Sequence, residues 1–389
     1  MSDFPSHRTD RWHRFIPRMS VRTLMISVLV LGGGFGWVAH LARIQREAIS
    51  AIRKAGGSII YDWQYDGAEL RVVKGTNISI NEVPGWPRWL VDRLGVDWFG
   101  NVRHGSLGRG GERPGQLAPE VIHDALVHIG RLRRLRQLVL IMTPVDDDDM
   151  ACLSGLSDLE GLMIRGRNRS EVTDRGVLHL KGLTGLKGLY LEDSQITDAG
   201  VACLEGLTRL ESLNLARTRV GDPGLAHLKN LPRLKSLVLD GTRVTDAGLV
   251  PLLRGRTDYE ALYLNDTQVG DATLEAIRGM ERLEWLHLRC TRVTDAGMAF
   301  VTGLKSLRSL DLFRANVGDV GVGHLSRLTR LEFLNLDGTR VGDGGLGSLS
   351  GLKNLKELRL METQVSVEPK GLKASLPNTR IDAVGKNWR

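Results

Sequence analysis

Aromatic residues are scarce in this chain. Phe, Trp and Tyr together make up 5% of its 389 residues, whereas glycine reaches 46. A composition with so few large side chains argues against one large globular core, although the length would allow two or three ordinary domains. It favours an extended architecture built from many small, similar turns.

Cysteines and catalytic motifs are scarce as well. Cys152, Cys203 and Cys290 are too few and too scattered for a disulfide framework, and their odd number leaves at least one thiol free. The sequence contains no nucleophile elbow, no zinc-protease His pair and no phosphate-binding loop after a strand. We therefore expect a protein that is not an enzyme and binds no cofactor.

Acidic residues do not balance the basic ones, and the net charge is +8. The excess is local: residues 1–54 hold nine Lys or Arg against three Asp or Glu. Residues 137–389, by contrast, carry no net charge. A nucleic-acid-binding protein needs a basic footprint on its main surface, so we expect no nucleic acid partner.

One long uncharged run lies near the N-terminus. Residues 23–42, TLMISVLVLGGGFGWVAHLA, carry no formal charge, and about 20 apolar residues suffice to cross a bilayer. They predict a single-pass transmembrane helix after a basic segment, residues 1–22. Arginines on both sides only slightly favour a cytoplasmic N-terminus, with the rest of the chain on the non-cytoplasmic side. A cleaved signal peptide is the alternative, although no good cleavage site is present.

Two glycines in this run have the spacing at which membrane helices approach one another closely. Gly32 and Gly36 form a GxxxG pattern. The pattern predicts a weak homodimer. The alternative is that glycine is simply frequent in membrane helices.

Residues 43–130 predict a linker helix and an N-terminal cap region. Apolar residues first recur at helical spacing, and residues 58–65 (SIIYDWQY) then alternate as a strand does. Residues 105–119, rich in Gly, Pro and Arg, predict a loop. An aromatic cluster between them is expected to cover the open end of a repeat array; a ligand platform is the alternative. The cluster consists of Trp86, Trp89, Trp98 and Phe99.

From about residue 131 the sequence repeats itself. LKSLVLDGTRVTDAGLVPL (234–252), LEWLHLRCTRVTDAGMAFV (283–301) and LEFLNLDGTRVGDGGLGSL (331–349) align without gaps. Most steps between units are 24 residues; one is 27 because of an insertion in RGRNRSEV, and one is 25 because of PLLRGRTDYE. Such a unit cannot bury its own apolar side, whereas stacked units form one continuous core.

The positions inside a unit have distinct expected roles. Alternate strand positions place Leu237 and Leu239 on the core side. Thr242 represents a threonine that recurs just after the strand, where its hydroxyl can bond backbone groups of the turn or of the adjacent unit. Ala315 lacks this hydroxyl.

The unit L-x-x-L-x-L-x-x-T-x-V, followed by T/G-D-x-G, resembles the leucine-rich repeat family in its 24-residue T-D-A-G-L variety. The resemblance covers residues 100–385. It implies an α/β solenoid over residues 131–385, with a curved parallel sheet and helices on the convex side. The layout is similar to bacterial membrane-anchored leucine-rich-repeat proteins. The repeats also resemble those of F-box ubiquitin-ligase receptors, although the chain has no F-box.

One aspartate recurs at the same position of each unit. Asp222 is followed by Pro223, and proline is favoured at the first helical position, which predicts that Asp222 is an N-cap. In TPVDDDDMACL (143–153) Asp147 takes this position, so the four adjacent aspartates are interpreted as a degenerate cap. A hard-cation site is the alternative. By register the cap role is also predicted for Asp174, Asp198, Asp246, Asp271, Asp295, Asp319 and Asp343.

A second column of the repeat contains possible metal ligands. Cys152, His179, Cys203 and His227 occupy the same helix position in four successive units. Cysteine and histidine are the ligands that zinc prefers. Four units extend beyond one coordination sphere, so we expect no metal site.

Strand positions that point away from the leucine core face the concave side, which solenoids use for binding. In consecutive units these positions hold aromatic and arginine side chains, which are enriched in interface hot spots. We predict that they bind a partner; the alternative is that they pack against one another or against a neighbouring unit. The predicted patch consists of Tyr263, Trp285, His287, Arg289, Asp311, Phe313, Arg314 and Phe333.

Together these features predict a non-enzymatic, membrane-anchored protein that binds a protein or glycan partner through its concave face. The F-box resemblance supplies a second hypothesis. In that case the chain would be a substrate-recognition adaptor of a ubiquitin-ligase-like or other degradation complex, and its array would have to be cytoplasmic.

Overall fold

The computed structural model describes residues 21–62, 101–108, 118–166, 170–366 and 370–383. Most of the predicted basic segment, residues 1–22, lies outside the described residues. So does the predicted aromatic cap of Trp86, Trp89, Trp98 and Phe99. The chain divides into two compact units, which are Met1–Arg46 with Asn77–Phe99, and Glu47–Thr76 with Gly100–Arg389.

Helix α1 (Val21–Lys54) begins in the first unit and contains the predicted transmembrane residues 23–42. Among the residues that the structure describes, no helix combines the length and the apolar character needed to cross a membrane. The membrane span therefore stays a prediction. Gly32 and Gly36 lie exposed in this helix, and a Cβ at either position would meet nothing within 4 Å. The homodimer that their spacing predicts also stays a prediction.

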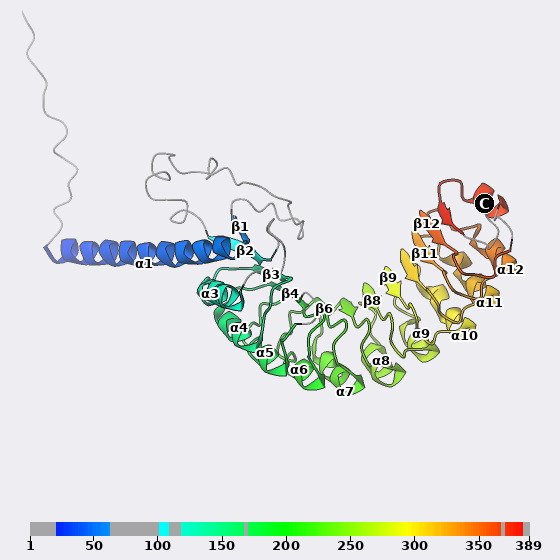
Figure 1. The fold of residues 1–389 in the computed structure, drawn as a ribbon, viewed down its shortest axis with the longest axis horizontal. Helices are drawn as coiled ribbons and strands as arrows, with labels where there is room; N and C mark the ends of the chain where they lie inside the picture. Colours follow the sequence, from blue (N-terminus) through cyan, green and yellow to red (C-terminus); the bar gives the residue numbers. More distant parts are fainter. Residues whose placement is uncertain (1–20, 63–100, 109–117, 167–169, 367–369, 384–389) are drawn as a thin grey trace, which may run out of the picture. The chain divides into compact units, whose positions relative to one another are not determined.

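The described part of the second unit holds one 13-stranded sheet whose strands follow the order of the chain (Figure 1). β1 (Ser58–Tyr61) pairs with β2 (Val102–Leu107) in antiparallel orientation, and the following pairs are parallel. The parallel ladder thus begins at β2, before residue 131 and partly inside the segment predicted as a loop. The later strands are β3 (Gln137–Ile141), β4 (Gly161–Arg165), β5 (Gly188–Tyr190), β6 (Ser212–Asn214), β7 (Ser236–Val238), β8 (Ala261–Tyr263), β9 (Trp285–His287), β10 (Ser309–Asp311), β11 (Phe333–Asn335), β12 (Glu357–Arg359) and β13 (Arg380–Asp382).

Short helices cover the convex side of this sheet, and the strands line its concave side (Figure 1). The repeat pattern predicted this arrangement. The α-helices are α3 (Pro119–Ile129), α4 (Asp147–Cys152), α5 (Asp174–Leu178), α6 (Asp198–Ala202), α7 (Asp222–Leu225), α8 (Asp246–Leu253), α9 (Asp271–Ile277), α10 (Asp295–Met298), α11 (Asp319–Gly323), α12 (Asp343–Leu346) and α13 (Lys370–Ser375). The 3-10 helices are η3 (Leu153–Gly155), η4 (Ala226–Asn230), η5 (Ala299–Gly303), η6 (His324–Arg327) and η7 (Gly347–Leu349).

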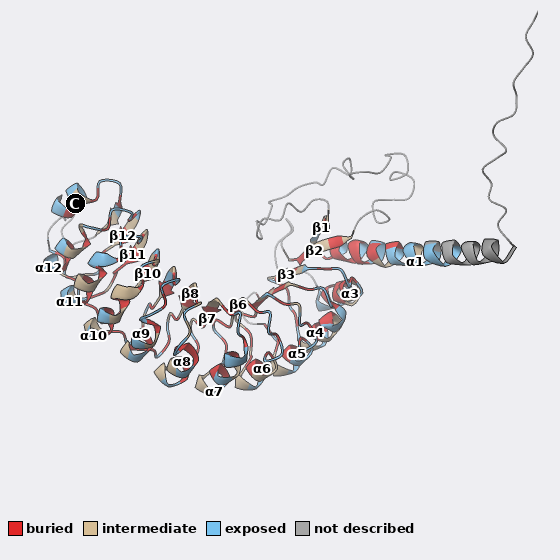
Figure 2. Cartoon of the chain, turned by 180° about the vertical axis from the view of Figure 1, so that it is seen from behind, coloured by how far each residue is buried: buried red, intermediate tan, exposed pale blue. Residues whose placement is uncertain are grey.

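The core runs between the sheet and the helices as a continuous layer of leucines. Leu237 and Leu239 are fully buried, as their strand positions predicted. Figure 2 shows that buried residues recur in every described turn of the array. Burying one leucine contributes about 1.5–3 kcal/mol. Because each unit offers only a few such residues, the array is stable only when neighbouring units stack.

Two contacts fix the turn that follows each strand. Gly241 has a φ of 65°, and its N–H donates to the carbonyl of Asn265 in the next unit at 2.7 Å. Thr242 Oγ1 donates to the Leu239 carbonyl of its own unit at 2.6 Å. The recurring threonine therefore closes its own turn, which was one of the two predicted roles. At Ala315, which lacks the hydroxyl, only the backbone N–H bonds the corresponding carbonyl.

The recurring aspartates do not cap their own helices, so that prediction was wrong. Asp295 is the first residue of its helix, and Thr294 before it is the N-cap. The carboxylate of Asp271 instead accepts hydrogen bonds from the N–H and the hydroxyl of Thr294, at 2.8 and 2.6 Å. Stacking places the turn of the next unit against the carboxylate. The backbone N–H at this position of the next unit also donates to Asp147, Asp174, Asp198, Asp222, Asp246, Asp295, Asp319 and Asp343. Where that position is a glycine, as it is opposite Asp198, Asp246, Asp295 and Asp319, the N–H donates without a hydroxyl beside it.

This contact explains the glycine that stands two residues after seven of the nine recurring aspartates, the exceptions being Asp147, which Asp149 follows, and Asp271. A Cβ added at Gly297 would lie 2.2 Å from Asp271 Oδ1. In one unit Thr273 replaces the glycine, and its hydroxyl donates to Asp246 at 2.5 Å. The T-D-x-G pattern is therefore a contact between units. A Cβ would lie 2.4 to 2.6 Å from the preceding aspartate at Gly176, Gly200, Gly224, Gly248, Gly321 and Gly345.

The run of four aspartates starts helix α4. Asp146, not Asp147, is the N-cap, and it forms a capping box with Asp149, in which each carboxylate accepts the other's backbone N–H. Asp147 makes the forward contact to Thr173. Asp149 is buried and bonds His123 Nδ1 at 2.8 Å, and burial raises the pKa of its carboxyl. These three carboxylates are therefore turned toward separate protein groups.

The contact between Asp271 and the next unit can be tested with a double-mutant cycle. We expect Asp271→Ala to destabilise the array by about 1–3 kcal/mol, because two donors of Thr294 lose their acceptor. Gly297→Ala should also destabilise it, because the added Cβ meets the carboxylate. Together the two changes should cost less than their sum, by about 0.5–3 kcal/mol, since removing the carboxylate makes room for the methyl group. Urea denaturation of the four proteins measures this coupling.

Gly206→Ala provides the control, because a Cβ at Gly206 would meet nothing within 4 Å. Its effect should add to that of Asp271→Ala. Additive losses for Asp271→Ala and Gly297→Ala would contradict the contact.

Candidate partner-binding surface

The predicted patch residues lie on four neighbouring strands, β8 to β11, or directly after them. Parallel pairing places Trp285 of β9 and Phe333 of β11 opposite Ser309 of β10. The intervening leucines of these strands are fully buried, so the residues that alternate with them face the concave side. We call the following residues the concave patch: Tyr263, Trp285, His287, Arg289, Asp311, Phe313, Arg314 and Phe333.

Trp285 is the most exposed aromatic side chain of this patch. It keeps 37% of its surface exposed, whereas Phe333 and Phe313 are half-buried. Ser309, between Trp285 and Phe333, is too small to cover either ring. An indole with half-buried aromatic neighbours presents apolar area at little cost in side-chain entropy.

His287 is fixed by two contacts within the patch. Its ring forms a T-shaped pair with Tyr263, with the ring centroids 4.7 Å apart, and its Nε2 lies 2.9 Å from Ser309 Oγ. Burial lowers the pKa of His287 and raises the pKa of Tyr263. Both rings are therefore neutral near neutral pH. Sequence reasoning missed Ser309, although its position opposite Trp285 in the strand register was a usable signal.

Two guanidinium groups lie close to the ring of Phe313. The Arg289 guanidinium carbon is 4.4 Å from the ring centroid of Phe313, and that of Arg314 is 4.9 Å away. Arg314 adopts a φ of 54°, which lets its N–H donate to the carbonyl of Asp337 at 2.8 Å. Its guanidinium pairs with Glu362 at 3.3 Å. The patch therefore carries cation–π contacts as well as apolar area.

An acid–base pair bounds the patch on the side of β12. Asp337 is only 3% exposed and accepts the N–H of Met361 at 2.5 Å. Arg359 Nε lies 2.9 Å from Asp337 Oδ2. Burial raises the pKa of the Asp337 carboxyl, and Arg359 opposes that rise. The predicted patch includes neither residue, because a contact between two units is not visible in a single repeat.

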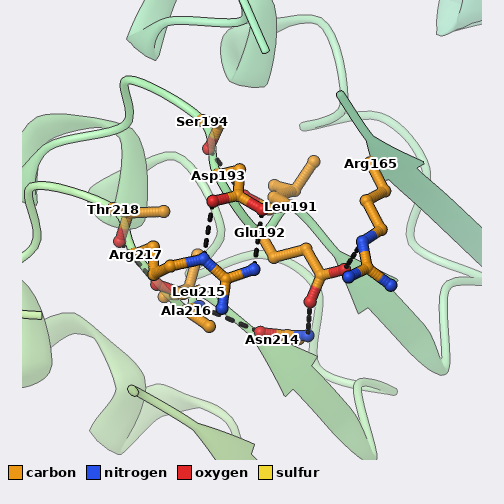
Figure 3. A network of polar contacts seen from close by, with 10 residues as sticks. All are labelled: Arg165, Leu191, Glu192, Asp193, Ser194, Asn214, Leu215, Ala216, Arg217 and Thr218. Carbon is orange, nitrogen blue, oxygen red and sulfur yellow. Dashed lines mark hydrogen bonds and ion pairs between the residues drawn. The ribbon is translucent and has the colours of Figure 1, made fainter. Parts of the chain in front are cut away.

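Toward β4 the concave side carries charged residues that neutralise one another (Figure 3). Glu192 bonds Arg165 at 2.8 Å and Asn214 Nδ2 at 3.0 Å. Arg217 donates two hydrogen bonds to Asp193, at 2.6 and 2.7 Å. The charged groups of this network bond one another, and none of the residues drawn in Figure 3 is aromatic.

The contact between Ser309 and His287 has the distance of a nucleophile and its base. Acyl transfer would also need a group that orients the histidine and donors that stabilise an oxyanion. Asp311 Oδ1 accepts the N–H of Phe313 at 2.9 Å. Within the described residues, no carboxylate bonds the ring of His287.

The neutral state of His287 predicts a pH dependence. Because burial lowers its pKa, the unfolded chain binds this proton more readily, and stability is lost as the pH falls below about 6.5. Asp311 and Asp240 face the ring and oppose the lowering. The urea concentration at the unfolding midpoint should fall between pH 7.5 and pH 5. We expect this fall to be smaller in His287→Gln, whose side chain can still bond Ser309 but does not titrate.

Burial also lowers the pKa of His104. Because both proteins contain His104, the difference between their pH profiles reports on His287. Equal pH profiles for the two proteins would contradict a buried neutral imidazole.

Comparisons with known proteins agree with the repeat structure. Residues 281–341 match a family model described as leucine rich repeat. An internalin (inlF) from Listeria monocytogenes is 24% identical over 67% of this chain and 71% of its own, with a TM-score of 0.55. A leucine-rich-repeat protein from Leptospira interrogans is 17% identical over 72% of this chain and 89% of its own, with a TM-score of 0.41.

A search of curated proteins gave no match. The likeness to the internalin concerns the fold alone. It agrees with the described ladder of short parallel strands and with the family match inside that ladder. Residues 281–341 therefore match leucine-rich repeats, within an array that has the fold of a leucine-rich-repeat solenoid.

Proposed function

We propose that this chain is a non-enzymatic binding protein that holds a protein partner against the concave patch. The observation that carries the proposal is the exposed Trp285 ring on the concave side, with Phe333 beyond Ser309 and with Arg289 stacked on Phe313. Aromatic and arginine side chains dominate the energetic centres of protein interfaces. Solenoids present such centres on their concave surfaces.

Other exposed apolar residues of the array are not grouped in this way. Leu178 lies on α5, Val320 on α11 and Met142 directly after β3, with 53%, 69% and 44% of their surfaces exposed. Single exposed apolar side chains are normal on protein surfaces. Trp285 differs because the same face of neighbouring strands also carries Phe333, beyond Ser309 in the register.

The membrane anchor is a separate proposal, which concerns residues 23–42. This stretch is helical and carries no formal charge. Its Trp37, Val38 and Leu41 side chains are exposed. Exposed apolar side chains on an uncharged helix suit a lipid environment. We propose that the segment anchors the chain in a membrane, with the array on the non-cytoplasmic side.

The binding proposal is tested by removing the two aromatic rings on either side of Ser309. We expect Trp285→Ala combined with Phe333→Ala to weaken capture of the natural partner at least about tenfold, because centres of this kind lose about 2 kcal/mol or more on truncation. The measurement is quantitative crosslinking of the full chain in its own membranes, followed by the affinity of the partner so identified.

Leu178→Ala combined with Val320→Ala removes two exposed apolar side chains from the helices and serves as the matched control. It should leave capture unchanged. Equal capture by the two double variants would rule out the concave patch.

The anchor proposal is tested by membrane fractionation. The full chain should stay in the membrane pellet after alkaline carbonate extraction, and deletion of residues 23–42 should release it. A variant with residues 23–42 in shuffled order keeps the apolar composition and should stay in the pellet. Release of the full chain by carbonate would show that the segment does not span a membrane, and protease protection in intact cells reports the side of the array.

A further inference from the structure

Arg289 differs from the other arginines that line the concave side. Its side chain is exposed, and in the described parts of the chain no carboxylate lies within 4.0 Å of its guanidinium. Its strand neighbours at this position are Asn265 and Phe313, which carry no charge. Arg289 therefore holds a charge that its own fold leaves without a partner.

The remaining concave arginines each have an acid. Their carboxylate partners lie 2.6 to 3.3 Å away. Each of these arginines is thereby neutralised by the carboxylate that it contacts. The pairs are Arg165 with Glu192, Arg217 with Asp193, Arg314 with Glu362, Arg359 with Asp337 and Arg380 with Asp382.

The Arg289 side chain is also held in place. Its guanidinium stacks on Phe313 at 4.4 Å, and Asn265 Oδ1 accepts its backbone N–H at 2.9 Å. Stacking occupies the face of the guanidinium and leaves its N–H edges free. A planar fork held in this way is suited to bind a carboxylate through two parallel hydrogen bonds.

We propose that Arg289 receives a carboxylate of the partner, from a peptide segment that places an apolar side chain against Trp285. This inference rests on the proposed function of the concave patch. Trp285 and Arg289 are four residues apart, about 13 Å along an extended strand. An extended peptide lying along β9 would therefore carry its carboxylate about four residues from its apolar side chain.

The carboxylate could belong to an acidic side chain or to the end of the peptide. Asp311, the acid of the patch, accepts the N–H of Phe313 through Oδ1 at 2.9 Å. Its negative charge repels a bound anion, and this repulsion grows with the charge of the anion. A singly charged carboxylate meets this restriction better than a phosphate.

The test uses two randomised 12-residue peptide libraries, selected on the full chain. One library has an amidated C-terminus and the other a free one. We expect Asp or Glu to be enriched about four positions from an apolar residue in the amidated library. Enrichment only in the free-ended library, with the apolar residue about four positions from the end, would also support the proposal and would assign the carboxylate to the C-terminus.

The selected peptides are then measured on variants. Arg289→Gln should weaken them about tenfold to a hundredfold, because a charge-assisted pair of hydrogen bonds is lost. Arg289→Lys keeps the charge but not the planar fork, so its affinity for the peptides should lie between that of the unchanged protein and that of Arg289→Gln. The matched control is Arg292→Gln, which changes an exposed arginine of the same unit by the same charge and should have no effect.

The outcomes separate this inference from the proposed function. Peptides that depend on Trp285 but show no carboxylate enrichment and no loss with Arg289→Gln would overturn the inference alone. Peptides that bind equally well to the Trp285→Ala variant, or a failure of both libraries to yield binders, would overturn the proposed function and the inference with it.

Discussion

The array depends on one hydrogen-bonding contact that is repeated from unit to unit. Leucine burial drives the stacking, but it is non-directional and does not by itself fix how one unit sits on the next. The Asp271 carboxylate does so, because it accepts both the N–H and the hydroxyl of Thr294 in the next unit. It thereby positions the start of the next helix and excludes any side chain at Gly297. The start of the next helix and the glycine pattern thus follow from the same contact.

Much of this architecture could be predicted from the sequence, because the 24-residue period is visible without coordinates. The period correctly assigned Leu237 and Leu239 to the core and the helices to the convex side. It failed on the aspartates, since Asp222 before Pro223 has the local signature of a cap, while its true partner, Thr245, lies 23 residues further on. A local signal cannot reveal such a partner. The glycine two residues later could have done so, because a helix cap gives no reason for it.

The candidate site was predictable to a lesser degree. Strand alternation was enough to place Trp285 on the concave side, and its exposure agrees. Stacking of two arginines on Phe313 was not predictable, because Arg314 reaches the ring from a left-handed backbone position. Because this residue is not a glycine, the sequence does not indicate that its backbone is left-handed. The conformation is imposed by the ladder, since the N–H of Arg314 must reach the carbonyl of Asp337. Tertiary context therefore decides the side-chain arrangement.

The position of the patch within the array bears on how recognition would be encoded. The two irregular steps of the repeat, of 27 and 25 residues, both precede Asp271, and the units from Asp271 to Asp343 all advance by 24. The patch therefore lies mainly on the regular part of the backbone, and its distinct surface comes from side chains placed on a common scaffold. A site on regular strands is held more firmly than one on loops. Concave substitutions in these units should consequently change what is bound while leaving the contact between Asp271 and Thr294, and with it the stacking of the units, unchanged.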